Sequence, residues 1–396
     1  MRGRSLVKPE LNASILRWSR KHAEISVEKA ATRAKVPPER IRNWENSNSD
    51  DRPTIRQARK LANLYGRSVL EFFGDEIPPV FEPIAIPDFR LSPHSATDID
   101  KKSIKSIRVW VEAQRANALS LYSDIGDNPP TIPSGLYTNI HADVELAAQK
   151  ARKFLEFPIH QQVDLKRDER RGIPKRIRNH IGNVGVLVLR CPELASENIR
   201  GFCVYLNPMP IIVLSQESPT AEAFTLMHEF AHVLLQSSAI SGHLTPGGGA
   251  GEIQAVENWC NRFAAAFLMP RKEVDDLYPE TGVIMESVQD ERLRKMAEYF
   301  GVSEEAMLIR LVQLKRVKSS YYWDIKKPQF DELAKSTQSY GRSSYYGSRF
   351  RNRQGDLYTS LVLEALSLDR ITSHNAAEYM GFQKIDHLYE IQANFP

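Results

Sequence analysis

The chain has 396 residues, 42% of them hydrophobic, and a formal net charge of +4. This length indicates two or three domains, and the composition is that of a soluble globular protein, which excludes a disordered or fibrous one. No apolar run approaches the roughly 18 residues of a membrane-spanning helix, and the basic N-terminus lacks the apolar core of a secretory signal. We therefore expect a cytoplasmic protein.

The first 74 residues predict a compact all-helical unit, because apolar residues recur there at helical spacing. Five short helices fit this stretch, and Ser26 and Thr54 are the expected N-caps of the second and the fourth. The stretch holds 16 Lys and Arg against 8 Asp and Glu. Such a basic surplus is typical of a nucleic-acid-binding surface, although a solvated basic face would give the same balance.

A proline-rich stretch, IPPVFEPIAIPDF, follows and predicts an extended connector. Beyond it we expect helices and short strands in alternation. The helices are expected over residues 98–124, 141–156, 219–236 and 252–268, and the strands over 184–189, 201–206 and 211–214. The remainder is predicted to be largely helical, with a less regular basic segment over 319–354 and last helices over 357–366 and 373–380.

The most informative motif is His-Glu-Phe-Ala-His at residues 228–232. Two histidines four residues apart on a helix project from one face about one turn apart, near enough to bind one metal ion. Glu229 lies beside them, where its carboxylate can act as a general base. The alternative is an amphipathic helix with two incidental histidines. Its apolar neighbours predict a largely buried helix, however, and two unpaired histidines would destabilise it there.

A catalytic zinc site needs a third protein ligand, with water in the fourth position. The next predicted helix supplies Glu257, and we favour it because a helical residue is held more rigidly than a loop residue. The competing candidates are His243, in a glycine-rich loop, and Glu252. The three cysteines show no Cys-x-x-Cys spacing, so a cysteine-rich zinc site is not indicated.

Two segments carry a family resemblance. FTLMHEFAHVLL, followed by ENWCNRFAAAFLMP, resembles the ImmA/IrrE family of zinc-dependent endopeptidases over about residues 140–315. The resemblance implies that His228, His232 and Glu257 bind Zn²⁺ and that Glu229 is the catalytic base. One departure is Cys260, which precedes Asn261 where the family usually has alanine.

Residues 11–73 are similar to the Xre/Cro-type helix-turn-helix family. SVEKAATRAKV matches the second helix and turn, and PPERIRNWENS matches the recognition helix. The N-terminal residues of that helix read the major groove in such domains, so Arg40, Arg42 and Asn43 are the candidate DNA contacts. Pro37, Pro38 and Glu39 depart from the small polar residues usual there, and a helix-turn-helix fold used for protein contacts is the alternative.

Together these patterns predict a mainly helical α+β chain. The expected segments are a helix-turn-helix domain over residues 1–76, a connector and helix over 77–139, a zincin-like domain with a small sheet over 140–315, and a basic and helical C-terminal region over 316–396.

The resemblances imply a zinc-dependent endopeptidase linked to transcriptional regulation. The expected partners are DNA, through the N-terminal domain, and a protein substrate such as an Xre-type repressor or an antitoxin. No membrane partner is expected, and homodimer formation is left open. The alternative function is a DNA-binding regulator whose peptidase-like domain senses a ligand or partner without cutting. A toxin paired with a small antitoxin is a third hypothesis.

Overall fold

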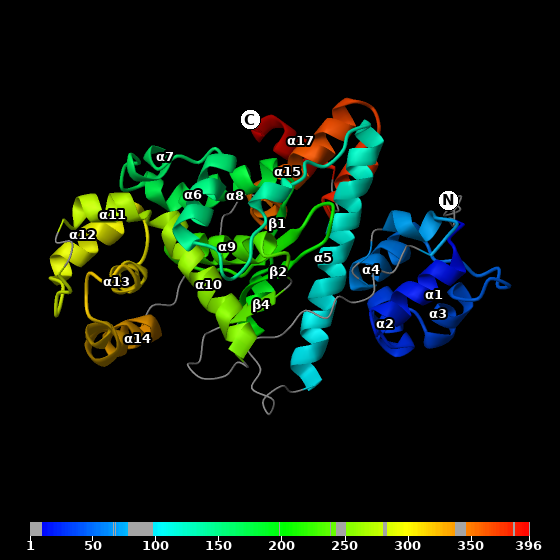
Figure 1. Cartoon of the computed structure of the whole chain (residues 1–396). Coiled ribbons are helices and arrows are strands. Elements are labelled where there is room, and N and C mark those ends of the chain that lie inside the picture. The colour runs from blue at the N-terminus through cyan, green and yellow to red at the C-terminus, as the bar shows by residue number, and fades with distance from the viewer. Residues whose placement is uncertain are drawn as a thin grey trace. The chain divides into compact units, whose positions relative to one another are not determined.

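A computed structural model describes residues 10–65, 67, 69–77, 98–197, 199–237, 239–242, 251–279, 283–336, 346–382 and 385–395. Its described residues fall into two compact units, whose elements are labelled in Figure 1. The first unit contains residues 10–77, 98–128 and 360–395, and the second contains residues 129–359. This division cuts across the predicted segments 77–139 and 316–396, each of which contributes to both units.

The first unit begins with the predicted helical domain. Its elements are α1 (Ala13–His22), α2 (Val27–Ala34), α3 (Pro38–Trp44), α4 (Ile55–Tyr65) and the 3-10 helix η1 (Val69–Phe73). Both predicted N-caps are confirmed: the Ser26 hydroxyl accepts a hydrogen bond from the backbone N–H of Lys29 at 3.1 Å, and Thr54 exchanges hydrogen bonds with Gln57. The helices enclose a core that includes Ile15, Leu16, Ile41, Trp44, Leu61, Tyr65 and Phe72.

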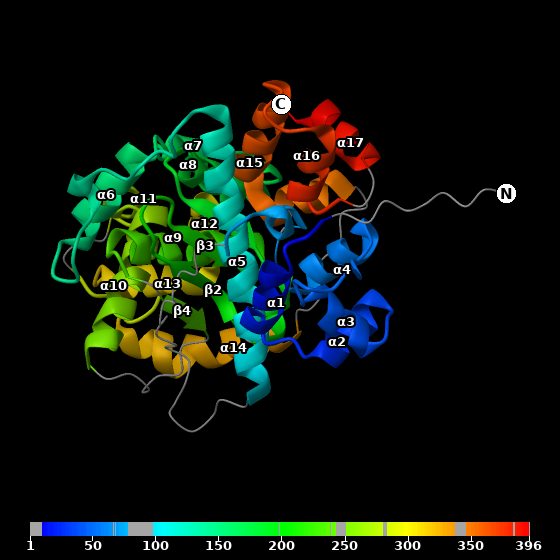
Figure 2. The ribbon, with the colours of Figure 1, turned by 90° about the vertical axis from the view of Figure 1, so that its right-hand side faces the viewer.

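The C-terminal helices complete this unit together with α5 (Asp98–Ile125). They are the last part of α15 (Tyr346–Ser367), α16 (Ser373–Tyr379) and α17 (Asp386–Asn394), which Figure 2 shows. Arg59 of α4 forms an ion pair with Glu378 of α16, with Nε and Oε1 2.6 Å apart. The helix-turn-helix elements and the C-terminus of the chain are therefore joined by direct side-chain contact.

The second unit contains a four-stranded sheet in the order β1-β3-β2-β4. The strands are β1 (Leu187–Arg190), β2 (Ile199–Val204), β3 (Ile211–Leu214) and β4 (Ala239–Gly242). β1 pairs with β3 in parallel, whereas β2 is antiparallel to both β3 and β4. The prediction of β3 is confirmed. β1 begins three residues later and ends one residue later than predicted, and β2 lies two residues earlier than predicted. β4 was not predicted, because four residues ending in Ser-Gly carry too little strand signal.

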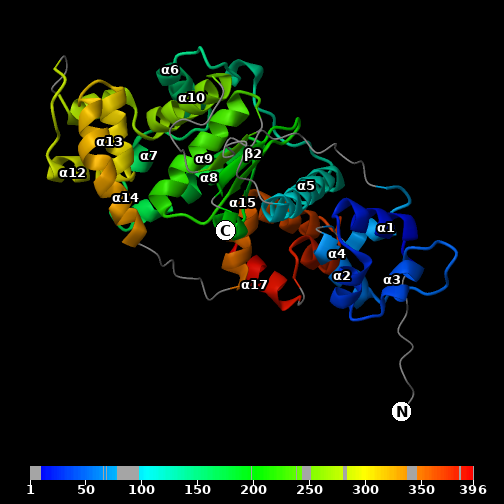
Figure 3. The same ribbon diagram turned by 90° about the horizontal axis from the view of Figure 1, so that it is seen from below.

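Helices surround this sheet. They are η2 (Ser134–Leu136), α6 (Val144–Phe154), α7 (His160–Val163), η3 (Glu169–Gly172), α8 (Ile173–Asn183), η4 (Pro192–Glu197), α9 (Pro219–Leu234), α10 (Gly251–Leu268), α11 (Arg271–Leu277), α12 (Asp290–Phe300), α13 (Glu304–Gln313), the π-helix η5 (Tyr321–Lys326) and α14 (Lys327–Ser336). α12, α13 and α14 lie together at one end of the unit (Figure 3).

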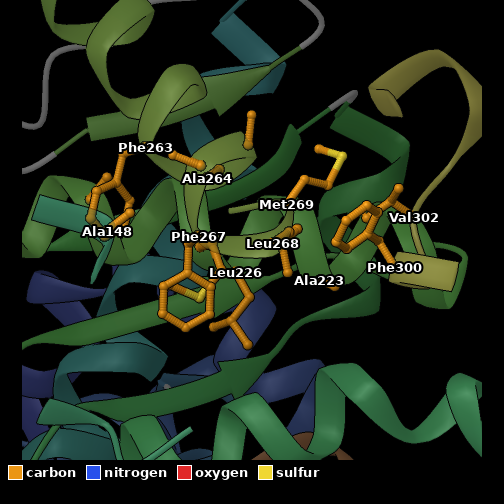
Figure 4. Close-up of a cluster of buried hydrophobic side chains, with 14 of the residues drawn as sticks. Ala148, Ala223, Leu226, Phe263, Ala264, Phe267, Leu268, Met269, Phe300 and Val302 are labelled. Carbon is orange, nitrogen blue, oxygen red and sulfur yellow. The ribbon is translucent and has the colours of Figure 1, made fainter. Parts of the chain in front are cut away.

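The main core forms where α9 and α10 meet. α9 packs on β2 and β3, α10 packs on α9, and α6 covers α10. Figure 4 shows side chains of this core, among them Leu226, Phe263, Phe267 and Phe300, all of which are fully buried. Each large apolar side chain buried in this way contributes about 1.5–3 kcal/mol. The packing therefore holds α9 and α10 rigidly against each other, which fixes the side chains that project between them.

One predicted segment is corrected. Residues 319–354 were expected to be less regular than the rest, but the described part forms η5, α14 and the start of α15. Gly355 interrupts α15 with φ of 83°, a left-handed value that glycine adopts without strain. At this break, Nη1 of Arg178 donates a hydrogen bond to the carbonyl oxygen of Asn352 at 2.7 Å. Spacing alone showed only the second half of α15, as the predicted helix over 357–366, because polar residues and the break at Gly355 hide the periodicity before it.

Candidate functional site

The His-Glu-Phe-Ala-His motif lies in the last two turns of α9. The helix starts where expected, with Ser218 as N-cap and Pro219 at the first helical position. After its first turn α9 is almost entirely buried, so both histidines project into the protein and not into solvent. α10 brings Glu257 to the same point, because it packs lengthwise on α9.

Three donor groups converge between the two helices. Nε2 of His228 and Nε2 of His232 are 3.3 Å apart. Glu257 places Oε2 3.2 Å from Nε2 of His228 and Oε1 3.2 Å from Nε2 of His232. All three residues are at most 5% exposed. Two imidazoles and a carboxylate in this arrangement form a group that could hold a metal ion.

The outer nitrogens of both imidazoles also have partners. Nδ1 of His228 lies 3.1 Å from Oδ1 of Asn261, one helical turn beyond Glu257 on α10. Nδ1 of His232 lies 3.1 Å from the hydroxyl of Ser237, just after α9. Each ring is therefore contacted at both nitrogens, and its orientation is fixed.

Glu229 is fully buried and faces the sheet. A Cβ atom placed on Gly201 of β2 would lie 3.1 Å from Oε1 of Glu229 and 3.0 Å from both Cγ2 of Thr225 and the carbonyl oxygen of Val213. The absence of a side chain at residue 201 therefore leaves room for the Glu229 carboxylate against the strand.

The charges of the group favour an ionised carboxylate. Burial alone would raise the pKa of Glu257, but hydrogen bonds and charge interactions with the two histidines hold it well below its usual range. Burial would likewise lower the pKa of His228, but its hydrogen bond to Glu257 and the charges of Glu257 and Glu229 leave it raised. For His232 burial prevails and its pKa is lowered.

The cysteines near this group are not candidate ligands. Cys203 and Cys260 are buried, and burial raises the pKa of each thiol well above its ordinary value. A thiol binds metal as the thiolate, and these two stay protonated. They are small, fully buried core residues.

The three candidate DNA contacts lie on α3 but differ in availability. Arg40 forms a two-point ion pair with Asp51 at 2.9 and 2.7 Å, and its guanidinium lies 5.1 Å from the centre of the Trp44 ring. Arg42 is exposed and reaches Glu28 only at 3.5 Å. Asn43 is exposed as well. Arg42 and Asn43 can therefore meet a partner directly, whereas Arg40 is held in place within the domain.

Comparison with known families assigns both parts of the chain. Residues 182–312 match the model of the IrrE N-terminal-like domain, a family of peptidases, and residues 16–72 match a helix-turn-helix model. The chain carries an IrrE N-terminal-like domain behind a helix-turn-helix domain. Both predicted resemblances are confirmed. No curated protein and no solved structure matches the chain. The two domains support a regulator with a peptidase-family domain.

The IrrE N-terminal-like domain contains all of the predicted metal-site residues and brings them together. Of the competing third ligands, His243 and the side chain of Glu252 lie outside the described residues. Among the residues that are described, no other cluster of three His, Cys, Asp or Glu side chains converges in this way. In the same part of the chain, no helix is long and apolar enough to cross a membrane.

The sequence did not single out Gly201, Ser237 or, as a functional residue, Asn261. A glycine inside a strand is a signal for a close backbone approach, so Gly201 could have been found. Asn261 sits one turn after Glu257, and that spacing places the two on one helix face. Ser237 gave no signal, because its position depends on how the chain leaves α9.

Proposed function

We propose that this chain is a zinc-dependent endopeptidase linked to transcriptional regulation, which cleaves a protein substrate such as a repressor or an antitoxin-like protein. The observation that carries the proposal is the convergence of His228, His232 and Glu257 within 4.8 Å, with Glu229 on the same helix. The match to a peptidase family supports the proposed peptidase activity, and the helix-turn-helix domain supports the link to transcriptional regulation.

The donor set fits zinc. Two imidazole nitrogens and one carboxylate are ligands that suit a catalytic zinc site, whereas calcium and magnesium prefer oxygen ligands alone. Bonds of about 2.0–2.1 Å to zinc give a tetrahedron with edges of about 3.3–3.4 Å. The separations of 3.2 and 3.3 Å between the donor atoms agree with this edge. When bound, zinc would supply a Lewis acid that polarises a peptide carbonyl and acidifies a water molecule.

The residues of the site would have separate roles in binding the metal and transferring protons. Ionised Glu257 and the two imidazoles would hold the metal, and the carboxylate would neutralise part of its charge. Glu229 would take a proton from the attacking water and deliver it to the leaving amine nitrogen. Burial of all four side chains excludes bulk water and strengthens their electrostatic interactions.

The helix-turn-helix domain would direct this activity to DNA. Arg42 and Asn43 are exposed on α3, where arginine can read guanine and asparagine can read adenine in the major groove. Arg40, paired with Asp51, would act by holding α3 in place.

The test is cleavage of a co-encoded repressor or antitoxin by purified full-length protein, with and without zinc. Glu229→Gln should keep zinc and lower the cleavage rate by about 10²–10⁴-fold, the usual contribution of a general base. Glu291→Gln, on the exposed surface of α12, is the matched control and should cleave at the wild-type rate. Unchanged cleavage by Glu229→Gln would remove Glu229 from the mechanism.

A second candidate function is a DNA-bound regulator that senses a ligand or partner without cutting. The full burial of Glu229 favours it, because a substrate water must reach this carboxylate in a peptidase. The two candidates differ in one result. If the protein is a sensor, it should protect a discrete operator in footprinting, and the His228→Ala variant should still regulate normally. If it is a peptidase, the His228→Ala variant should lose regulation, because a metal ligand is missing.

A further inference from the structure

In both hydrogen bonds to the outer imidazole nitrogens, the donor and the acceptor can be assigned. The hydroxyl of Ser237 lies 3.4 Å from the carbonyl oxygen of His232 and donates its hydrogen there. Its lone pair is then left to accept a hydrogen from Nδ1 of His232 at 3.1 Å. The side-chain oxygen of Asn261 can only accept, so Nδ1 of His228 donates to it at 3.1 Å.

With a metal held between them, both imidazoles would be neutral and would carry their hydrogen at Nδ1. A neutral imidazole has one N–H and one lone pair, so Nε2 of each ring presents its lone pair to the space shared with Glu257. The opposite tautomer would place each hydrogen on Nε2, which faces Glu257 at 3.2 Å, and would so remove the lone pair that would bind the metal. It would also leave Nδ1 of His228 facing an oxygen with no hydrogen between them.

We propose that Asn261 and Ser237 are positioning residues that set the histidine tautomers for metal binding. This inference rests on the proposed zinc site and adds its supporting residues. One face of α10 then contributes two groups to the site. Glu257 is a ligand, and Asn261, one helical turn later, orients His228. Ser237 supports His232 from the chain that leaves α9, where its own backbone N–H also bonds the His232 carbonyl at 3.0 Å.

The test is the Zn²⁺ affinity of full-length variants, measured by competition with a chelator. Asn261→Leu has a similar volume but no acceptor, and it should bind zinc about 10–100-fold more weakly, as is usual when the partner of a ligating histidine is lost. Asn261→Asp restores an acceptor and should bind at least as tightly as wild type. Asn258→Leu changes an exposed asparagine of the same helix and should have no effect. Ser237→Ala should weaken zinc binding in the same direction.

A second measurement needs no variant. In zinc-loaded wild-type protein, long-range ¹H–¹⁵N correlations of the histidine rings should place the hydrogen on Nδ1 of both His228 and His232. A hydrogen on Nε2 of either ring would overturn the proposal, as would an Asn261→Leu variant that binds zinc within threefold of wild type. Wild-type protein that binds no zinc would instead refute the proposed function, so the two failures are distinguishable.

Discussion

Replacing Gly201 with alanine tests how closely α9 must approach the sheet. The added Cβ would lie 3.0 Å from Cγ2 of Thr225 and from the carbonyl oxygen of Val213, and 3.1 Å from Oε1 of Glu229. Carbon atoms in contact prefer about 3.5–4.0 Å, so each neighbour must move by several tenths of an ångström. Val213 belongs to the central strand β3 and cannot yield easily. α9 and the Glu229 carboxylate must therefore shift.

The expected loss of unfolding free energy is about 1–3 kcal/mol, the usual effect of forcing an extra methyl into a packed core. A catalytic group misplaced by about 1 Å can lower the rate 10²-fold, so the smaller shift of Glu229 should lower cleavage on the order of tenfold. Zinc content should not change, because the displaced carboxylate is not a ligand.

The assay combines urea unfolding, zinc content and cleavage rate. Gly172→Ala is the matched control, since a Cβ there meets nothing within 4 Å and its backbone φ is negative. It should leave all three quantities within error of wild type. If Gly201→Ala were as stable and as active as Gly172→Ala, the close fit of Glu229 against β2 would not be a constraint on the site.

Four further predictions concern metal, DNA and stability. Zinc at 100 times its Kd should stabilise the protein by about 2.7 kcal/mol and raise its Tm in calorimetry, whereas a chelator should reverse the shift and His228→Ala should show none. Arg42→Ala should weaken binding to an operator by about 1–3 kcal/mol in fluorescence anisotropy without changing stability. Arg40→Ala should chiefly lower the stability of the domain, because it leaves Asp51 without its two-point ion pair; a larger DNA effect than that of Arg42→Ala would contradict this. Arg310→Met should destabilise the protein by about 1–3 kcal/mol in urea unfolding, because it removes a buried guanidinium that donates hydrogen bonds to Glu145 and to the Met269 carbonyl oxygen.

Local patterns predicted which three side chains converge between α9 and α10. The four-residue spacing of His228 and His232 fixes their relation within one helix, and the preference for a helical third ligand selected Glu257. The N-caps Ser26 and Thr54 were found for the same reason, since a cap acts within one turn of its own residue.

Contacts between residues far apart in the sequence could not be predicted from local patterns. Arg40 had the type and position of a DNA contact, but its pairing with Asp51 depends on the path of the loop between α3 and α4. The C-terminal helices were assigned to a segment of their own, 316–396, yet Glu378 forms a hydrogen bond with Arg59, more than three hundred residues earlier in the chain. Such contacts carry no periodicity along the chain, so only the folded structure reveals them.

The metal content of purified full-length protein tests the central claim most directly. Wild-type protein should carry about one zinc per chain by elemental analysis, as a three-ligand site requires, and Glu257→Ala should carry almost none. His243→Ala, which removes the competing third ligand, should keep its zinc. Wild-type protein without zinc would contradict a centre built from His228, His232 and Glu257. So would a His243→Ala variant that loses zinc together with a Glu257→Ala variant that keeps it.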